Sequence, residues 1–243
     1  MTAIASAQNP RLKALRRLHT RRERARHGRF LAEGEDLVAA ASTAGREAVE
    51  GYRLAGSGLG EAGFHDVERA ALAGASSLGS GTRVIGVYEQ RWVPAVGPLC
   101  VYLHGVGDPG NVGAVLRSAH AFGASCVALG PGCADPHGPK AVRASMGAIF
   151  AVALARVGSV GELPGERVAL VAGAGEPLRG EGAVGRAVTL LVGAERDGLP
   201  DDVVQECDRV AHIPIASESL NAAMAATVAL YEMTRQPSRV PAE

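Results

Sequence analysis

The segment that decides the fold is LCVYLHGVGDPGNVGAVLRSA, residues 99–119. It opens with a short apolar run, crosses a glycine-rich loop, and continues with apolar residues at helical spacing, namely Val112, Val115, Leu116 and Ala119. A buried strand followed by a loop and an amphipathic helix is the building unit of parallel α/β domains. The strand half of this unit recurs downstream in CVALG (126–130), RVALVAG (167–173) and AVTLLVGAE (187–195). We therefore predict an α/β fold with a parallel sheet covered by helices on both faces.

The loop of this segment matches the dinucleotide-binding pattern G-x-G-x-x-G from Gly105 to Gly110. A dinucleotide site also needs an acidic residue at the end of the second strand, which here ends CVALGPG, with Asp135 only in the following loop. Pro109 removes a backbone N–H from the loop that would face a pyrophosphate. We therefore interpret the glycine spacing as coincidental, and an NAD-dependent oxidoreductase is the least favoured hypothesis.

Bulk composition indicates a folded protein in a reducing compartment. The 243 residues are 47% apolar and 4% aromatic, and the four cysteines show no C-x-x-C spacing, which favours a cytoplasmic location. The longest apolar segment, MGAIFAVALA, is too short to span a bilayer, and the N-terminus lacks a signal-peptide pattern, so we expect no membrane association. His104 and His212 lack ligand spacing, so we expect no metal.

Charge is balanced over the whole chain but not along it. Residues 11–29 contain nine Lys/Arg and one acid, whereas the rest of the chain has 16 basic and 24 acidic residues. A one-signed basic segment on an acidic body favours a polyanionic partner, most simply RNA or DNA, over an ordinary solvated helix face. A helix is predicted to begin at Asn9-Pro10, which would present these basic residues above a leucine stripe.

The chain changes character at RWVPAVGP (91–98), whose two prolines indicate a linker. We predict an N-terminal domain over 1–95 and a second domain over 96–243. Within the second domain, the pattern predicts one helix over 140–149, a strand near 149–155, and a long closing helix over 218–236.

Three segments of the second domain resemble, in order, the motifs of SpoU-type (TrmH-like) RNA ribose methyltransferases of the SPOUT superfamily. They are NVGAVLRSAHAFGA (111–124), LLVGAERDGLP (190–200) and IPIASESLNAAMAATVALYE (213–232), and KAVRASMGAIF (140–150) is also similar. More loosely, NPRLKALRRL and RFLAEGEDLVAAA resemble the RNA substrate-binding domain of many members, a small α/β module of ribosomal-protein type. Residues 50–80 depart from that module because they are short and glycine-rich.

The resemblance implies transfer of a methyl group from S-adenosyl-L-methionine to a ribose 2′-oxygen of RNA. It implies a SPOUT domain with a deep trefoil knot, and a homodimer formed partly by the last helix. Ribosomal RNA is the preferred substrate; tRNA methylation and a catalytically silent RNA-binding protein remain alternatives. The RNA, the nucleotide, and the choice between a housekeeping and an antibiotic-resistance role stay open.

The resemblance also implies the site residues. The cofactor would contact Val171, Ala172, Gly173, Gly193, Ala194, Ile213, Pro214, Ser219 and Leu220. The catalytic set would be Arg117, Asn111, Glu195 and Asn221. A guanidinium is a poor general base, so we expect Arg117 to clamp a phosphate and stabilise the developing alkoxide, and the identity of the base stays open. RNA would be contacted by Arg11, Lys13, Arg16, Arg17, Arg21, Arg22, Arg143 and Ser145. For the last two, a structural salt bridge of Arg143 and a helix hydroxyl of Ser145 remain equal alternatives.

Overall fold

The fold is described from a computed structural model that covers residues 2–78, 81–179 and 186–235. Residue 236 of the predicted last helix, and the outer ends of the two predicted domains, lie outside these ranges. The chain forms two compact units, one made of Met1–Arg91 with Asp135–Ala151, the other of Trp92–Ala134 with Val152–Glu243. Residues 135–151, which we assigned to the second domain, thus cluster with the N-terminal unit.

The second unit is built on a seven-stranded sheet in the order β7-β6-β5-β10-β8-β11-β9. Every neighbouring pair is parallel. Its strands are β5 (Leu99–Leu103), β6 (Cys126–Leu129), β7 (Ala153–Arg156), β8 (Glu166–Leu170), β9 (Glu176–Pro177), β10 (Val188–Val192) and β11 (Arg209–His212). This confirms the predicted parallel α/β sheet; the trefoil knot stays a prediction.

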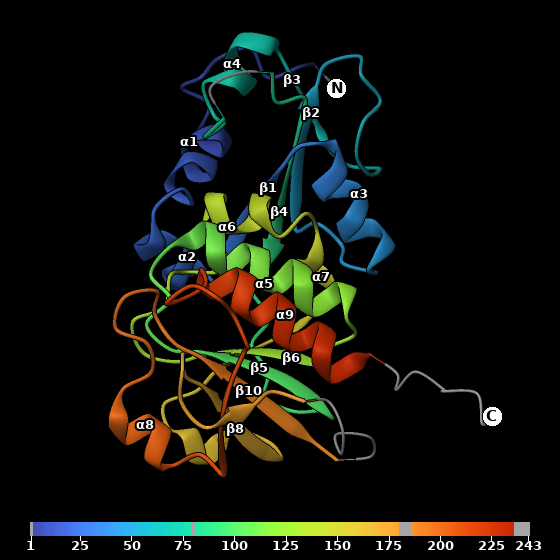
Figure 1. Ribbon diagram of the computed structural model, residues 1–243. Helices are drawn as coiled ribbons and strands as arrows, with labels where there is room; N and C mark the ends of the chain where they lie inside the picture. Colours follow the sequence, from blue (N-terminus) through green and yellow to red (C-terminus); the bar gives the residue numbers. More distant parts are fainter. Residues whose placement is uncertain (1, 79–80, 180–185, 236–243) are drawn as a thin grey trace, which may run out of the picture. The chain divides into compact units, whose positions relative to one another are not determined.

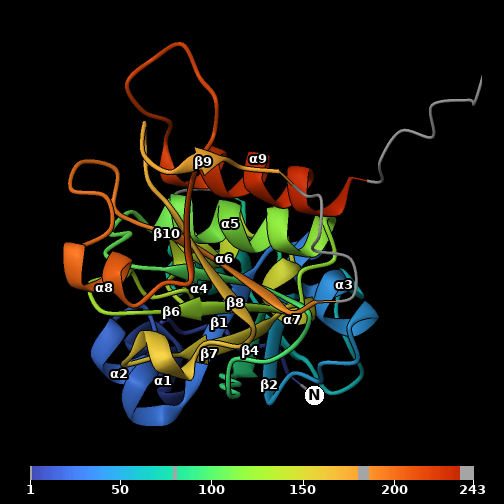
Figure 2. The ribbon, with the colours of Figure 1, turned by 60° about the horizontal axis from the view of Figure 1, so that its bottom comes forward.

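Helices cover both faces of this sheet. On one face, α5 (Pro109–Ala121) and α9 (Ala222–Thr234) lie side by side in both views (Figures 1 and 2). The hydroxyls of Ser118 and Thr227 join them at 2.6 Å. On the other face, α8 (Asp201–Gln205) and the short helix η1 (Val160–Glu162) pack on Tyr102 and Leu191. Both faces are therefore shielded from solvent, and this explains why the strand sequences are continuous apolar runs.

The helix starts are set by local chemistry. Asp108 caps α5 by accepting a hydrogen bond from the Asn111 N–H at 3.0 Å, and Pro109 follows at the first helical position. Asn221 caps α9 by accepting from the N–H groups of Ala223 and Met224. The prediction that the last helix begins at residue 218 was therefore wrong, because the cap places the start at Ala222 and leaves 213–221 as a loop.

The N-terminal unit contains a four-stranded sheet in the order β1-β4-β2-β3. Only the β2–β3 pair is parallel. The elements of residues 1–91 are α1 (Pro10–Arg17), α2 (Arg21–His27), β1 (Arg29–Glu33), α3 (Glu35–Thr43), β2 (Glu50–Leu54), β3 (His65–Val67), α4 (Arg69–Ala73) and β4 (Val84–Glu89). This confirms a small N-terminal α/β domain; its ribosomal-protein type stays a prediction.

Residues 135–151 do not form the single helix predicted over 140–149. They form α6 (Pro139–Ala144) and α7 (Ala148–Ala151), separated by Met146 at φ 48° and Gly147 at φ 91°. A Cβ at Gly147 would lie 2.4 Å from the Cβ of Ala40, so close packing on α3 breaks the helix. The strand predicted from 149 consequently begins only at Ala153.

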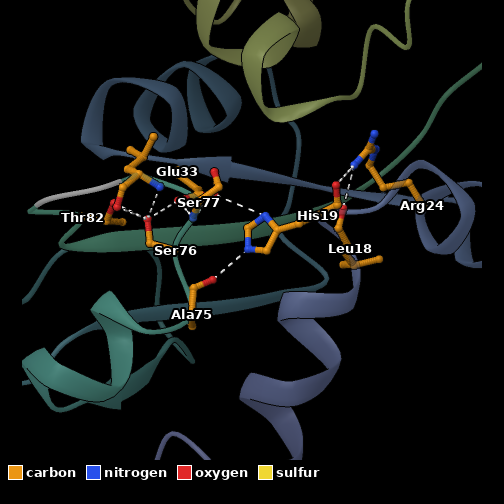
Figure 3. Close-up of polar contacts among 9 residues, drawn as sticks. Leu18, His19, Arg24, Glu33, Ala75, Ser76, Ser77 and Thr82 are labelled. Atoms are coloured by element: carbon orange, nitrogen blue, oxygen red, sulfur yellow. Dashed lines mark hydrogen bonds and ion pairs between the residues drawn. The ribbon is translucent and has the colours of Figure 1, made fainter.

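A buried acid ties the loop after α4 to the end of β1. Glu33 is 8% exposed and accepts hydrogen bonds from the Ser77 N–H and from the hydroxyls of Ser76 and Ser77 (Figure 3). The Ser76 hydroxyl also contacts that of Thr82 at 2.8 Å. Buried charge is costly unless it is hydrogen-bonded in this way, so these bonds hold Ser76 and Ser77 against the end of β1.

Candidate functional site

A cavity of about 170 Å³ lies where β8, β10 and β11 end. These three strands are adjacent and parallel, so their carboxyl ends meet at one edge, where open α/β sheets bind ligands. The lining is formed by Leu170, Val171, Ala172, Val192, Gly193, Ala194, Glu195, Arg196, Gly198, Ile213, Ile215, Ser219, Leu220, Ala222 and Ala225. Apolar side chains and backbone groups thus dominate the wall, with few charges.

A tight turn after β10 forms one side of the cavity. The N–H and carbonyl of Ala194 bond reciprocally with those of Gly198, at 3.0 and 3.1 Å. A Cβ at Gly193 would lie 2.1 Å from the carbonyl carbon of Gly198, and Gly198 itself has φ +66°. Glycine is therefore required at both positions for the turn to fold back on the strand end.

Seven of the nine predicted cofactor contacts line this cavity; Gly173 and Pro214 do not. Sequence reasoning missed several lining residues, including Arg196, Ile215 and Ala225. Ala225 could have been predicted, because it follows Asn221 by about one helical turn and so lies on the same side of the helix. Arg196 could not, because its only distinguishing feature in the sequence is that it follows Glu195.

Three of the four predicted catalytic side chains meet in one hydrogen-bond network. The amide of Asn111, on α5, donates to the Oε1 of Glu195, in the turn after β10. The Nδ2 of Asn221, at the cap of α9, donates to the Oδ1 of Asn111 at 3.1 Å. Residues separated by more than 80 positions in sequence are thereby joined, and Glu195 belongs to the cavity wall as well.

Arg117 stands apart from this network. It is exposed on α5, and within the described part of the chain it makes no hydrogen bond or ion pair. Because it is exposed and unpartnered within those ranges, its guanidinium is available to an external anion. The structure therefore brings Asn111, Glu195 and Asn221 together and leaves Arg117 unjoined to them.

The predicted RNA-contacting residues separate into engaged and available groups. Arg11 pairs with Glu50 at 2.6 Å, and Arg16 donates to the Ala7 carbonyl at 2.8 Å. The side chains of Lys13, Arg17, Arg21, Arg22 and Arg143 are exposed and make no ion pair with other residues in the described ranges. These five carry the free positive charge of the set.

Two further residues of these segments are structural. Ser145 is 0% exposed and its hydroxyl donates to the Val142 carbonyl at 2.6 Å, so the prediction that it contacts RNA was wrong. Arg24 is 4% exposed, donates to the carbonyls of Leu18 and His19 (Figure 3), and pairs with Asp135 at 2.8 Å. A basic sequence run therefore includes an arginine that belongs to the core.

Two negative findings concern the described residues alone. No helix in those ranges is long and apolar enough to cross a membrane. Nor do they contain a group of three His, Cys, Asp or Glu side chains arranged to hold a metal ion.

His104, at the end of β5, contacts the Tyr102 hydroxyl at 3.0 Å, and burial raises the pKa of that tyrosine to about 12.

The chain is similar to solved structures of methyltransferases. The AdoMet-bound rRNA methyltransferase from Sinorhizobium meliloti superposes with a TM-score of 0.84 at 30% identity, covering 96% of this chain and 97% of that one. The SpoU methyltransferase AviRb from Streptomyces viridochromogenes, in complex with AdoMet, gives 0.81 at 26% identity, covering 93% and 97%.

Two relatives in sequence are also rRNA methyltransferases. A 23S rRNA (guanosine(2553)-2'-O)-methyltransferase from Bacillus subtilis is 30% identical over 96% of this chain and 99% of its own length. A 23S rRNA (uridine(2479)-2'-O)-methyltransferase from Streptomyces viridochromogenes is 39% identical over 53% of this chain, which spans half of that protein.

Two family models match this chain, each over a different segment. The MRM3-like substrate binding domain matches residues 9–78. The model of the SpoU rRNA methylase family matches residues 98–231, more than half of the chain and all three strand ends of the cavity. With a relative aligned over nearly its whole length, this shows that the chain belongs to the SpoU rRNA methylase family.

Proposed function

We propose that this protein methylates a ribose 2′-oxygen of RNA with S-adenosyl-L-methionine as donor, and that the RNA is ribosomal rather than transfer RNA. The observation that carries the proposal is the network of Asn111, Glu195 and Asn221 beside the cavity at the sheet edge. The relatives named above act on 23S rRNA, which favours the ribosomal substrate.

The cavity suits part of this cofactor. Its wall offers apolar side chains such as Ile213 and Leu220 for an adenine ring, and backbone groups of the Ala194 turn for polar edges. The volume of about 170 Å³ is below the roughly 300–1,000 Å³ of sites that enclose a drug-sized ligand. We therefore assign the enclosed part to the adenosine and the open side to the reacting end.

When bound, the cofactor supplies an electrophilic methyl group, which bonds to the ribose 2′-oxygen as its bond to sulfur breaks and the hydroxyl proton is lost. The chain's own residues orient the hydroxyl: the Asn111 amide is fixed by Glu195 and Asn221 and cannot rotate freely. Glu195 supplies a carboxylate that can accept the proton. Arg117 holds a phosphate or the developing alkoxide.

RNA would reach the site through the available cations. Lys13 and Arg17 lie on α1, and Arg21 and Arg22 lie on α2, where each contact with a phosphate releases counterions. Replacing Arg21 with alanine should weaken RNA binding and lower the salt slope by about one ion. Replacing Arg24 should instead destabilise the fold, because its guanidinium is buried against Asp135.

We further propose a homodimer, a cytoplasmic location, the trefoil knot, and a functional boundary near residues 95/96. The dimer is supported by three exposed apolar side chains on α9: Met224 is 61%, Val228 40% and Tyr231 56% exposed. Their spacing of four and three residues forms one stripe on the helix, and such a stripe is costly to leave in water.

The activity is tested with cofactor carrying a labelled methyl group. We expect label to enter ribosomal RNA, and to be lost when the acceptor ribose is replaced by 2′-deoxyribose. Transfer to tRNA in preference to ribosomal RNA would contradict the substrate assignment. RNA binding that ignores the cofactor and is unchanged in Arg117→Ala, without any transfer, would favour the catalytically silent alternative.

A further inference from the structure

The cavity wall carries one unexplained cation. Of the described residues that line it, only Glu195 and Arg196 are charged. Glu195 is held by the Asn111 amide, whereas Arg196 is exposed and forms no hydrogen bond or ion pair with other residues in the described ranges. The proposed chemistry assigns a task to Glu195 and none to Arg196.

The turn fixes where this cation stands. Ala194 and Gly198 are joined by two backbone hydrogen bonds, so residues 195–197 form a short tip between them. Gly193 and Gly198 can have no side chain without collision or strain, which keeps the tip closed on the end of β10. The backbone that carries Arg196 is therefore held beside the end of β10, so its side chain starts from a fixed point on the cavity wall.

S-adenosyl-L-methionine would bring an anion to this part of the wall. Its methionyl carboxylate is only a few covalent bonds from the sulfonium sulfur, and the proposed function puts the reacting methyl beside Asn111 and Glu195. A carboxylate so close to the sulfur would face the stretch of wall that Glu195 and Arg196 both line. A guanidinium can hold a carboxylate through two parallel hydrogen bonds, which makes it a strong partner.

We propose that Arg196 binds the methionyl carboxylate of the cofactor, an inference that rests on the proposed function. The carboxylate is favoured over an RNA phosphate because Arg196 lines the cofactor cavity, whereas Arg117 already offers an exposed guanidinium outside that lining. The cavity then presents one negative and one positive side chain to a ligand end that carries both signs.

The test is calorimetric binding to the full chain, without RNA. Arg196→Ala should weaken S-adenosyl-L-methionine and S-adenosylhomocysteine alike by roughly tenfold to a hundredfold. It should change the affinity for 5′-deoxy-5′-methylthioadenosine, which has no carboxylate, by less than about twofold. Arg196→Lys should fall between. Arg179→Ala, an exposed arginine outside the cavity lining, is the matched control and should bind all three ligands normally.

The outcomes separate this inference from the proposed function. A native protein that binds no S-adenosyl-L-methionine contradicts the function itself. If Arg196→Ala binds S-adenosyl-L-methionine with normal affinity, the carboxylate assignment alone is overturned. This holds whether or not the variant also binds RNA more weakly. Equal weakening of methylthioadenosine also overturns it, because the defect would then lie in the adenosine part of the cavity.

Discussion

At the scale of single residues, Asn221 has two tasks that different atoms perform. Its Oδ1 caps α9 by accepting from Ala223 and Met224, and its Nδ2 donates to Asn111. The helix needs only an acceptor at this position, whereas the site needs a donor as well. The two roles can therefore be separated by a substitution that keeps the oxygen and removes the amide.

Asn221→Ala should cost about 1 kcal/mol of stability through loss of the cap, and should also reduce methyl transfer. Asn221→Asp keeps the cap but cannot donate to Asn111, so we expect near-native stability with reduced transfer. Denaturant unfolding and transfer of labelled methyl measure the two effects. Native transfer in Asn221→Asp would show that the Asn111 contact has no role in the reaction.

At the scale of elements, the break between α6 and α7 decides the packing of residues 135–151. Helical periodicity alone favoured one continuous helix, because apolar spacing does not record a backbone turn with positive φ. Gly147 adopts φ +91° and presses on Ala40 of α3, whereas Gly45, after the end of α3, adopts φ +64° with open space around it. These two glycines make a matched pair.

Gly45→Ala should destabilise the protein by about 1–2 kcal/mol, the cost of a left-handed residue with a side chain. Gly147→Ala should cost about 1–3 kcal/mol more, since its methyl group must also displace Ala40. Urea unfolding monitored in the N-terminal unit would measure the difference. Equal losses would mean that the contact with α3 is relaxed at little cost.

The starts of β8 and β11 are joined by a charge pair that should respond to acid. Hydrogen bonds from the side chain and N–H of Arg167 lower the pKa of Asp208 from 3.8 to about 2. Since the folded-state pKa is the lower one, the stabilisation is complete above about pH 4 and is lost as the pH falls towards 2. The pair is exposed, so solvent and salt keep the effect small.

Arg167→Met should therefore flatten the dependence of stability on pH below about pH 4. Urea unfolding across this range, in low and high salt, would measure it, with Arg179→Met as a control for the loss of one exposed positive charge. If the acid limb is as steep in Arg167→Met as in the native protein, other carboxylates account for it.

At the scale of the whole molecule, the exposed stripe of α9 predicts the assembly. A charge on this stripe should dissociate the proposed homodimer, because an apolar contact surface does not tolerate an unpaired carboxylate. We expect Val228→Glu to be monomeric in sedimentation, and Val49→Glu, a valine of similar exposure in the N-terminal unit, to remain dimeric. A native protein that is itself monomeric would refute the dimer.

The sequence alone determined the parallel sheet and the three segments that carry the candidate site. These features depend on short-range chemistry, namely apolar runs and small residues at strand ends, whereas the start of α5 at Pro109, which we had interpreted as part of the loop, came from the structure. The resemblance to the SpoU family implied nine cofactor contacts, and seven of them lie in the cavity wall; strand order explains why they meet, because parallel strands place their carboxyl ends at one edge.

Only the tertiary structure decided which polar groups meet. It joined Asn111 to Glu195 and Asn221, buried Ser145 and Arg24, and assigned residues 135–151 to the N-terminal unit. Burial and partner choice depend on contacts between residues distant in sequence, which no local pattern records. The same reason applies to Arg196. Its sequence context resembles that of any surface arginine, and only the structure shows that it lines the cavity.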